Sequence, residues 1–142
     1  MIIFDNVKEF EYCIMEIKKS RNTEKQNLVK KILSETAHAM SAEEIMATMP
    51  IKVNKTTIYR ILDRFADKGE VHFITGKNGK AYYALCDTNC GTSHKIHNHI
   101  HFECQICKEV TCQPNTLHIP NLEGFTIQET QFLVIGICNK CK

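Results

Sequence analysis

Long apolar runs are missing from this sequence of 142 residues. No stretch reaches the roughly 18 consecutive apolar residues that a membrane-spanning helix needs, so no such helix is expected. The first five residues are soon followed by charged side chains, which argues against a signal peptide. A hydrophobic content of 43% is enough for a packed core, so we expect a globular protein of the cytoplasm without membrane partners.

The signatures of common enzyme classes are missing too. A zinc hydrolase needs an open zinc position and a general base, often within a His-Glu-x-x-His motif, and the chain has no such motif. Neither a Ser-His-Asp arrangement nor a glycine-rich phosphate loop is evident. A Cys/His pair could serve a thiol enzyme, but the cysteines lie at the spacing of metal ligands. We therefore expect neither an enzyme nor a small-molecule substrate.

Charge and metal-binding residues divide the chain into two parts. Residues 1–83 contain 14 Lys and Arg against 11 Asp and Glu, net +3, whereas residues 84–142 contain 4 against 5, net −1. The second part holds 7 of the 8 cysteines and 5 of the 7 histidines, which in a cytosolic chain indicates metal binding rather than disulfides. The hypothesis is a DNA-facing domain over residues 1–85 and a metal-binding domain over residues 86–142.

The first part shows the pattern of a winged helix-turn-helix. Apolar periodicity, capping residues and turn signals predict four helices and then two strands, over residues 5–20, 23–35, 41–49, 54–67, 71–75 and 81–85. Ser41 and Glu44 have the spacing of a capping box, and Gly69 can adopt the positive φ that ends the fourth helix. The turn between the strands contains Lys77 and Lys80, which gives the wing a basic tip.

The second part has weaker signals for secondary structure. Residue patterns predict three strands, over residues 99–103, 109–112 and 125–135. Pro114 and Pro120 leave room only for a short or irregular helix between the last two strands. Helices in the first part and strands in both parts predict an α+β fold.

Two Cys-x-x-Cys pairs indicate a structural zinc site. Cys104 and Cys107 form the first pair, and Cys138 and Cys141 form the second near the end of the sequence. Four thiolates satisfy tetrahedral Zn²⁺ and leave no open position, and the metal would anchor the last residues to the domain. The alternative is a set of free or redox-active thiols.

A second group of candidate ligands lies where the two parts meet. His99 and His101 alternate as in a strand, so their side chains face the same way. His72 and Cys86 lie at the far ends of the two wing strands, which antiparallel pairing brings together. A metal bound by all four would bridge the two domains, whereas the alternative is a solvated histidine-rich loop.

Together, the helices, the wing and the cysteine motifs resemble the ferric uptake regulator family over roughly residues 10–141. The segments that carry the resemblance are Ser41 to Ile45, Thr56 to Leu62, Gly69 to Val71 and His99 to Cys107. The resemblance implies a winged helix-turn-helix followed by a small α/β dimerisation domain with a zinc site of four cysteines. It also implies a homodimer that binds inverted-repeat operator DNA and represses transcription when its regulatory metal site is filled.

Within this family, the candidate regulatory ligands are most similar to those of the zinc uptake regulators. The residues that match are His72, Cys86, His99 and His101. A thiolate such as that of Cys86 also favours Zn²⁺ over Fe²⁺. We therefore expect Zn²⁺ as both the structural and the regulatory metal. The alternatives are an iron-, manganese- or peroxide-sensing member, a constitutive zinc-stabilised DNA-binding module, or a zinc-binding interaction protein.

Three further residues are candidates for the regulatory site. His97 lies where some zinc sensors of the family take a ligand. Cys112 occupies a position that is commonly acidic in the family, and it is either a replacement ligand or a buried thiol. Glu103 shares a strand face with His101 and could compete as an oxygen ligand.

The fourth predicted helix would enter the major groove of DNA with its N-terminal residues. The residues expected to contact DNA lie on this helix and on the wing: Lys55, Thr56, Thr57, Tyr59, Arg60, Lys77 and Lys80. Tyr59 and Arg60 match the family's Tyr-Arg pair, and Arg suits a guanine edge. The wing lysines are expected to contact the DNA backbone. Arg21 could reach the adjacent minor groove, and Arg64 is expected on a solvated helix face.

Overall fold

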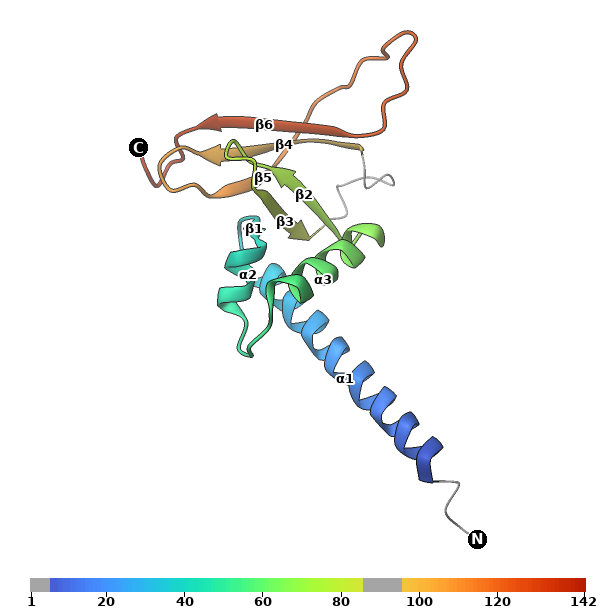
Figure 1. Cartoon of the computed structure of the whole chain (residues 1–142). Coiled ribbons are helices and arrows are strands. Elements are labelled where there is room, and N and C mark those ends of the chain that lie inside the picture. The colour runs from blue at the N-terminus through green and yellow to red at the C-terminus, as the bar shows by residue number, and fades with distance from the viewer. Residues whose placement is uncertain (1–5, 86–95) are drawn as a thin grey trace.

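A computed structural model describes residues 6–85 and 96–142, with side chains at residues 21–85 and 99–142. Within these ranges the elements, in chain order, are α1 (Asn6–Glu35), β1 (Met40–Ser41), α2 (Ala42–Thr48), α3 (Lys55–Asp67), β2 (Val71–Thr75), β3 (Ala81–Leu85), β4 (Ile96–Cys104), β5 (Val110–Thr116) and β6 (Thr130–Gly136) (Figure 1). Helices combined with two separate three-stranded sheets confirm the α+β class. No helix in the described ranges is both long and apolar enough to cross a bilayer.

Helix α1 is one continuous helix of 30 residues, so the prediction of two helices over residues 5–20 and 23–35 was wrong. The predicted break rested on Thr23 as a cap, yet Thr23 lies inside α1. Neither glycine nor proline separates the two segments, and Asn or Thr in a helix interior costs less than about 1 kcal/mol relative to Ala. Burial of Val29 and Leu33 in the core outweighs so small a cost.

The caps of helices α2 and α3 form as predicted. The Glu44 N–H donates to Ser41 Oγ at 3.3 Å, and the Ser41 N–H donates to Glu44 Oε2 at 2.7 Å, which completes the capping box. The Thr57 N–H donates to Asn54 Oδ1 at 2.8 Å and caps α3. Gly69 follows α3 with a φ of 70°. Asn54 and Gly69 therefore mark the two ends of α3, the helix that the sequence predicts to enter the major groove and that we call the recognition helix.

The predicted wing is confirmed and has a third strand. Strands β2 and β3 pair antiparallel, from Val71 opposite Leu85 to Thr75 opposite Ala81. The short β1 pairs with the other side of β3, so the sheet has the order β1-β3-β2 and β2 is an edge strand. One face of this sheet packs on the helices through Val71 and Tyr83.

The second sheet has the order β5-β4-β6, with β4 antiparallel to β5 and parallel to β6. All three predicted strands are present, with ends that differ from the prediction. The predicted short helix between the last two strands is wrong. Strand β5 continues through Pro114 to Thr116, and residues 117–129 contain no helix. An edge strand tolerates Pro114 because its outer side needs no backbone donor.

The wing lies between the helices and the second sheet (Figure 1). Its outer face, with Ile74 and Tyr82, packs on Val110 of β5. The Ala39 N–H donates to the Val110 carbonyl oxygen at 2.7 Å. The wing therefore connects the two parts of the chain. The predicted domain boundary after residue 85 falls where the described ranges are interrupted, and it stays a prediction.

Candidate metal centres and DNA-binding face

Four cysteines gather at one end of the second sheet, and we call them the four-cysteine cluster: Cys104, Cys107, Cys138 and Cys141. Their sulfur atoms all lie within 4.8 Å of one another, and the Cys107 and Cys138 sulfurs are 3.8 Å apart. Cys104 ends β4, and the turn after it contains Lys108 with a φ of 64°. A second turn, after β6, holds the other pair through the Cys141 N–H bond to the Cys138 carbonyl oxygen at 3.0 Å.

The electrostatics of the four-cysteine cluster favour a bound cation. The Cys138 N–H donates to the Cys104 sulfur at 3.4 Å. This bond, together with the N–H groups of Ile106 and Cys107 in the turn after β4, lowers the pKa of Cys104 to about 6. The pKa of Cys141 is raised to about 12, chiefly by its hydrogen bond with the Cys138 thiol. Sulfurs this close cannot all be thiolates unless a cation neutralises them. The donor set fits the predicted structural zinc, which takes four thiolates in tetrahedral geometry.

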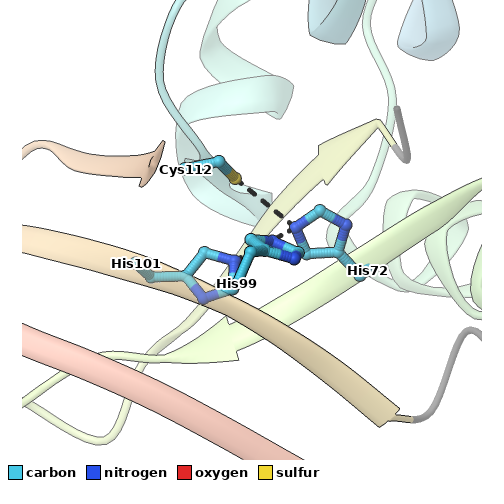
Figure 2. Close-up of side chains that lie close together, drawn as sticks. All are labelled: His72, His99, His101 and Cys112. Atoms are coloured by element: carbon cyan, nitrogen blue, oxygen red, sulfur yellow. Dashed lines mark hydrogen bonds between the residues drawn. The ribbon is translucent and has the colours of Figure 1, made fainter. Parts of the chain in front are cut away.

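A second cluster, which we call the interdomain cluster, joins the wing to the second sheet (Figure 2). It consists of His72 from β2, His99 and His101 from β4, and Cys112 from β5. The ligand atoms all lie within 4.8 Å of one another. His72 Nε2 lies 3.3 Å from His101 Nε2 and 3.5 Å from Cys112 Sγ. The three imidazoles are buried.

Strand pairing explains why these side chains meet. His101 is the direct cross-strand partner of Cys112, so both side chains project from the same face of the sheet. The pairing with β5 shifts register between His99 and His101, and the two rings lie 4.4 Å apart, centroid to centroid. His72 reaches them because the outer face of the wing packs on this sheet. Three imidazoles and a thiolate are a donor set that fits tetrahedral zinc.

The structure brings together three of the four predicted regulatory ligands, namely His72, His99 and His101. Cys86 lies outside the described residues, as does the side chain of His97, so their roles stay predictions. Cys112 is exposed, so the buried-thiol interpretation was wrong, and its sulfur lies in the cluster. The pairing of β4 with β5 is the signal that would have favoured Cys112 from the start.

The carboxylate of Glu103 does not belong to the interdomain cluster, although the sequence made it a competing ligand. Instead, the Lys77 N–H of the wing turn donates to Glu103 Oε2 at 2.8 Å. A second polar contact with the wing involves the last residue of β2. The Thr75 N–H donates to Gln131 Oε1 at 2.9 Å, and Gln131 Nε2 donates to the Thr75 carbonyl oxygen at 2.8 Å. Sequence reasoning missed both contacts.

The N-terminal half of α3 presents most of its predicted DNA-binding side chains to solvent. Those exposed are Lys55, Thr56, Tyr59 and Arg60, whereas Thr57 is half-buried. Lys55 Nζ lies 2.7 Å from Glu43 Oε1 and 5.7 Å from the centroid of the Tyr59 ring. The hydrogen bond with Lys55 lowers the pKa of Glu43, and the same bond raises the pKa of Lys55. Glu43, which sequence reasoning missed, therefore holds a basic residue at the start of α3.

A basic groove lies between α1 and α3, with a volume of about 310 Å³. Four cationic side chains line it, together with Asn22, Thr57 and Ile61: Arg21, Lys25, Arg60 and Arg64. Arg21 and Lys25 are one helical turn apart on α1, as are Arg60 and Arg64 on α3. Such a groove favours an anion, because a bound negative charge relieves the repulsion between the cations. Arg64 thus lines a groove with other cations, a position that sequence reasoning did not assign to it.

Lys77 and Lys80 are exposed in the wing turn, and the turn lies against the second sheet. Lys80 lines a second cavity of about 320 Å³ with Glu43, near the start of α2. The predicted contact of both lysines with the DNA backbone stays a prediction.

Comparison with known proteins identifies the family. Residues 16–129 match the model of the Ferric uptake regulator family. The ferric uptake regulation protein of Neisseria gonorrhoeae is 26% identical over 126 residues, which cover 82% of this chain and 79% of that protein.

Solved structures of the same fold are also similar. A zinc uptake regulator complexed with zinc and DNA is 21% identical with a TM-score of 0.60, covering 94% of this chain and 93% of that one. The ferric uptake regulator of Helicobacter pylori, described as having three functional metal binding sites, is 18% identical with a TM-score of 0.58, covering 93% of this chain and 90% of that one. The chain therefore belongs to the Ferric uptake regulator family of metal-responsive transcriptional regulators.

Proposed function

We propose that this chain is a zinc-responsive transcriptional repressor, which binds inverted-repeat operator DNA as a homodimer when its regulatory site holds zinc. The observation that carries the proposal is the interdomain cluster, whose ligand atoms come from the wing and from the second sheet. The similar fold of a zinc uptake regulator complexed with zinc and DNA supports it. A constitutive zinc-stabilised module would need only the four-cysteine cluster. That alternative leaves the three buried histidines beside a thiol unexplained.

Zinc is proposed as the regulatory metal because of the donor atoms. Three imidazoles and a thiolate suit Zn²⁺, whereas Fe²⁺ and Mn²⁺ favour additional oxygen ligands. The strand carboxylate that could supply one, Glu103, bonds to the wing turn instead. We assign the sulfur ligand to Cys112, and Cys86 remains a second candidate that the sequence suggests.

The response to metal would arise from the position of this cluster. His72 lies in β2, which follows α3 after a short turn, so a metal that ties His72 to β4 and β5 also restrains the recognition helix. Zinc would then favour those arrangements in which two α3 helices of a dimer match two half-sites. Because zinc binds such arrangements more tightly, it shifts the population toward the DNA-binding state.

DNA contacts are assigned to α3 and the basic groove. Tyr59 and Arg60 are exposed on α3, and we assign to them the base contacts that the sequence predicts. The groove between α1 and α3 would hold backbone phosphate through Arg21, Lys25 and Arg64. Phosphate contacts would set the position on the duplex, and base contacts the specificity.

A homodimer is proposed to form along the second sheet. Strand β6 is an edge strand, and its backbone can pair with a second copy. Apolar side chains are exposed on this strand and just after it, among them Val134, Ile135 and Ile137. A second copy related by a twofold axis would cover them and present two α3 helices to an inverted repeat.

The test is metal analysis of the purified chain followed by DNA binding. A DNA duplex selected from a random pool is titrated with protein at fixed salt, with Zn²⁺, Fe²⁺, Mn²⁺ or Ni²⁺ at controlled free concentrations. The proposal expects one zinc in each cluster and tight DNA binding only when zinc fills the interdomain cluster. DNA binding that does not depend on zinc in the interdomain cluster would indicate a constitutive module, and a stronger response to Fe²⁺ or Mn²⁺ would contradict zinc sensing.

A further inference from the structure

We propose that Glu103 and Gln131 are positioning residues that form a metal-independent clasp between the wing and the second sheet. By holding the two parts together before metal arrives, the clasp raises the affinity of the interdomain cluster for zinc. This inference rests on the proposed function and deepens it, because it assigns residues that bind neither metal nor DNA to the metal response.

The first half of the clasp is the buried carboxylate of Glu103. Only 5% of this residue is exposed, and its Oε2 accepts the Lys77 N–H at 2.8 Å. The close approach depends on Gly76, because a Cβ there would lie 3.2 Å from Glu103 Oε2 and 2.8 Å from a ring carbon of Tyr82. A charged acceptor makes the stronger kind of hydrogen bond to a backbone N–H, so this contact holds the wing turn firmly on β4.

The second half of the clasp is the side-chain amide of Gln131. It accepts the Thr75 N–H at 2.9 Å and donates to the Thr75 carbonyl oxygen at 2.8 Å, so it satisfies both backbone groups of one residue. Thr75 is at the end of β2, an edge strand of the wing sheet. The amide therefore acts like a one-residue neighbouring strand and attaches β2 to β6.

The clasp and the interdomain cluster hold opposite ends of the same strand. His72 lies near the start of β2, while Thr75 ends it and Lys77 follows in the turn. On β4, His101 and Glu103 are two residues apart and lie on the same face. Ile74, between the two attachment points, packs on Val110. With zinc bound, β2 is tied down at both ends, and without zinc the clasp end still holds.

This arrangement has a thermodynamic consequence for zinc binding. The interdomain cluster can bind zinc only when the wing is docked, so its apparent dissociation constant is the intrinsic one divided by the docked fraction. Loss of the clasp lowers that fraction and weakens zinc binding at this cluster. The four-cysteine cluster is unaffected, because all of its ligands come from the second part of the chain.

The test uses the full chain with Glu103→Gln, Gln131→Ala and the combined variant. Glu129→Gln and Gln113→Ala are matched controls: Glu129 is exposed, and the side chain of Gln113 bonds within β5 to Thr111. Zinc affinity at each cluster is measured by competition with a chromophoric chelator. Hydrogen exchange of the Thr75 and Lys77 amides is measured by NMR with zinc in the four-cysteine cluster alone.

The combined variant is expected to bind zinc at the interdomain cluster about tenfold more weakly, since it loses both hydrogen bonds of Gln131 and the negative charge on the acceptor of the Lys77 N–H. Zinc at the four-cysteine cluster should stay unchanged. The Thr75 and Lys77 amides should exchange slowly in the parent and the controls, and faster in the variants. At saturating zinc, DNA affinity should return to the parent value.

Unchanged zinc affinity at the interdomain cluster in the combined variant would overturn the proposal. So would fast exchange of both amides in the parent, because the clasp would then not exist without metal. Loss of zinc from both clusters in Glu103→Gln, which keeps the shape of the side chain, would show a general role in folding and also overturn it. If the zinc affinity changes as expected but the parent shows no zinc-dependent DNA binding, the clasp stands and the proposed function fails.

Discussion

The two candidate metal sites differ in which parts of the chain supply their ligands. The four-cysteine cluster takes all of its ligands from the end of β4 and from the short turns that follow β4 and β6, at one end of the second sheet. The interdomain cluster takes one ligand from the wing and three from β4 and β5. A metal in the first cluster can stabilise only the second sheet and its last residues, whereas a metal in the second restrains the two parts relative to each other. The difference teaches that two sites suited to the same kind of metal ion can differ in what they connect, and it is the basis for proposing a structural role for the first and a sensing role for the second.

The largest expected effect is at the four-cysteine cluster. Cys104→Ser should lose about one zinc per chain and unfold or fail to dimerise, because structural zinc contributes on the order of 10 kcal/mol of binding free energy to folding. Metal analysis and thermal melting followed by circular dichroism measure the two effects. Cys112→Ser is the matched control, since it removes a cysteine outside this cluster and should leave the structural zinc and the fold intact. A fully folded Cys104→Ser dimer with unchanged zinc content would contradict the structural role.

The next largest effect is expected from removing the two histidines of β4 from the interdomain cluster. The double change His99→Ala and His101→Ala is expected to abolish zinc-dependent DNA binding while the four-cysteine cluster keeps its zinc. Fluorescence anisotropy of a labelled duplex, over a range of buffered free Zn²⁺, measures the response. His118→Ala replaces an exposed histidine outside both clusters and should behave like the parent. Zinc-dependent binding by the double variant would show that the cluster is not the sensing site.

Removal of a single sulfur ligand from the interdomain cluster should have a smaller but still large effect on zinc-dependent DNA binding. Loss of a residue that only supports a metal ligand typically weakens metal binding roughly 10- to 100-fold. Cys112→Ser removes a proposed ligand itself, so it should raise the free zinc concentration needed for DNA binding by more than that factor. Cys86→Ser in the same assay decides between the two sulfurs, and the sequence predicts that this change abolishes zinc-dependent DNA binding. An effect of Cys86→Ser with none of Cys112→Ser would refute our assignment of Cys112.

The smallest expected effects are on the proposed DNA contacts, whose residues supply no ligand to either cluster. Arg60→Ala should cost about 1–3 kcal/mol of binding free energy for each lost base contact and should relax specificity. Lys77→Ala should weaken binding to all sequences alike and reduce the slope of the salt dependence by about 1. Titrations of matched and scrambled duplexes at several salt concentrations separate the two. Lys68→Ala, at the other end of α3, is the control, and an unchanged sequence preference of Arg60→Ala would mean that the recognition helix is misplaced.

Local signals predicted those elements that depend on neighbouring residues. The capping box at Ser41, the end of α3 at Gly69 and both wing strands appear where the sequence placed them. The caps are held by bonds within a few residues, and the wing strands pair across one short turn, so their sequence patterns carry enough information. The break predicted at Thr23 failed because a weak capping signal does not outweigh the packing of the continuous helix on the core.

By itself, the sequence indicated the four-cysteine cluster, the predicted recognition helix and the wing, because each Cys-x-x-Cys pair, each helix cap and each alternating strand is a pattern that can be recognised within a short stretch of the chain. Only the tertiary structure decided that Cys112 joins His72, that Glu103 bonds to the wing turn and that Gln131 bonds to Thr75. These contacts join residues 40, 26 and 56 positions apart. Nothing in the local pattern of either partner specifies the other. Their pairing follows from the docking of the wing on the second sheet, where burial of Ile74 and Tyr82 against Val110 brings the distant residues within bonding distance.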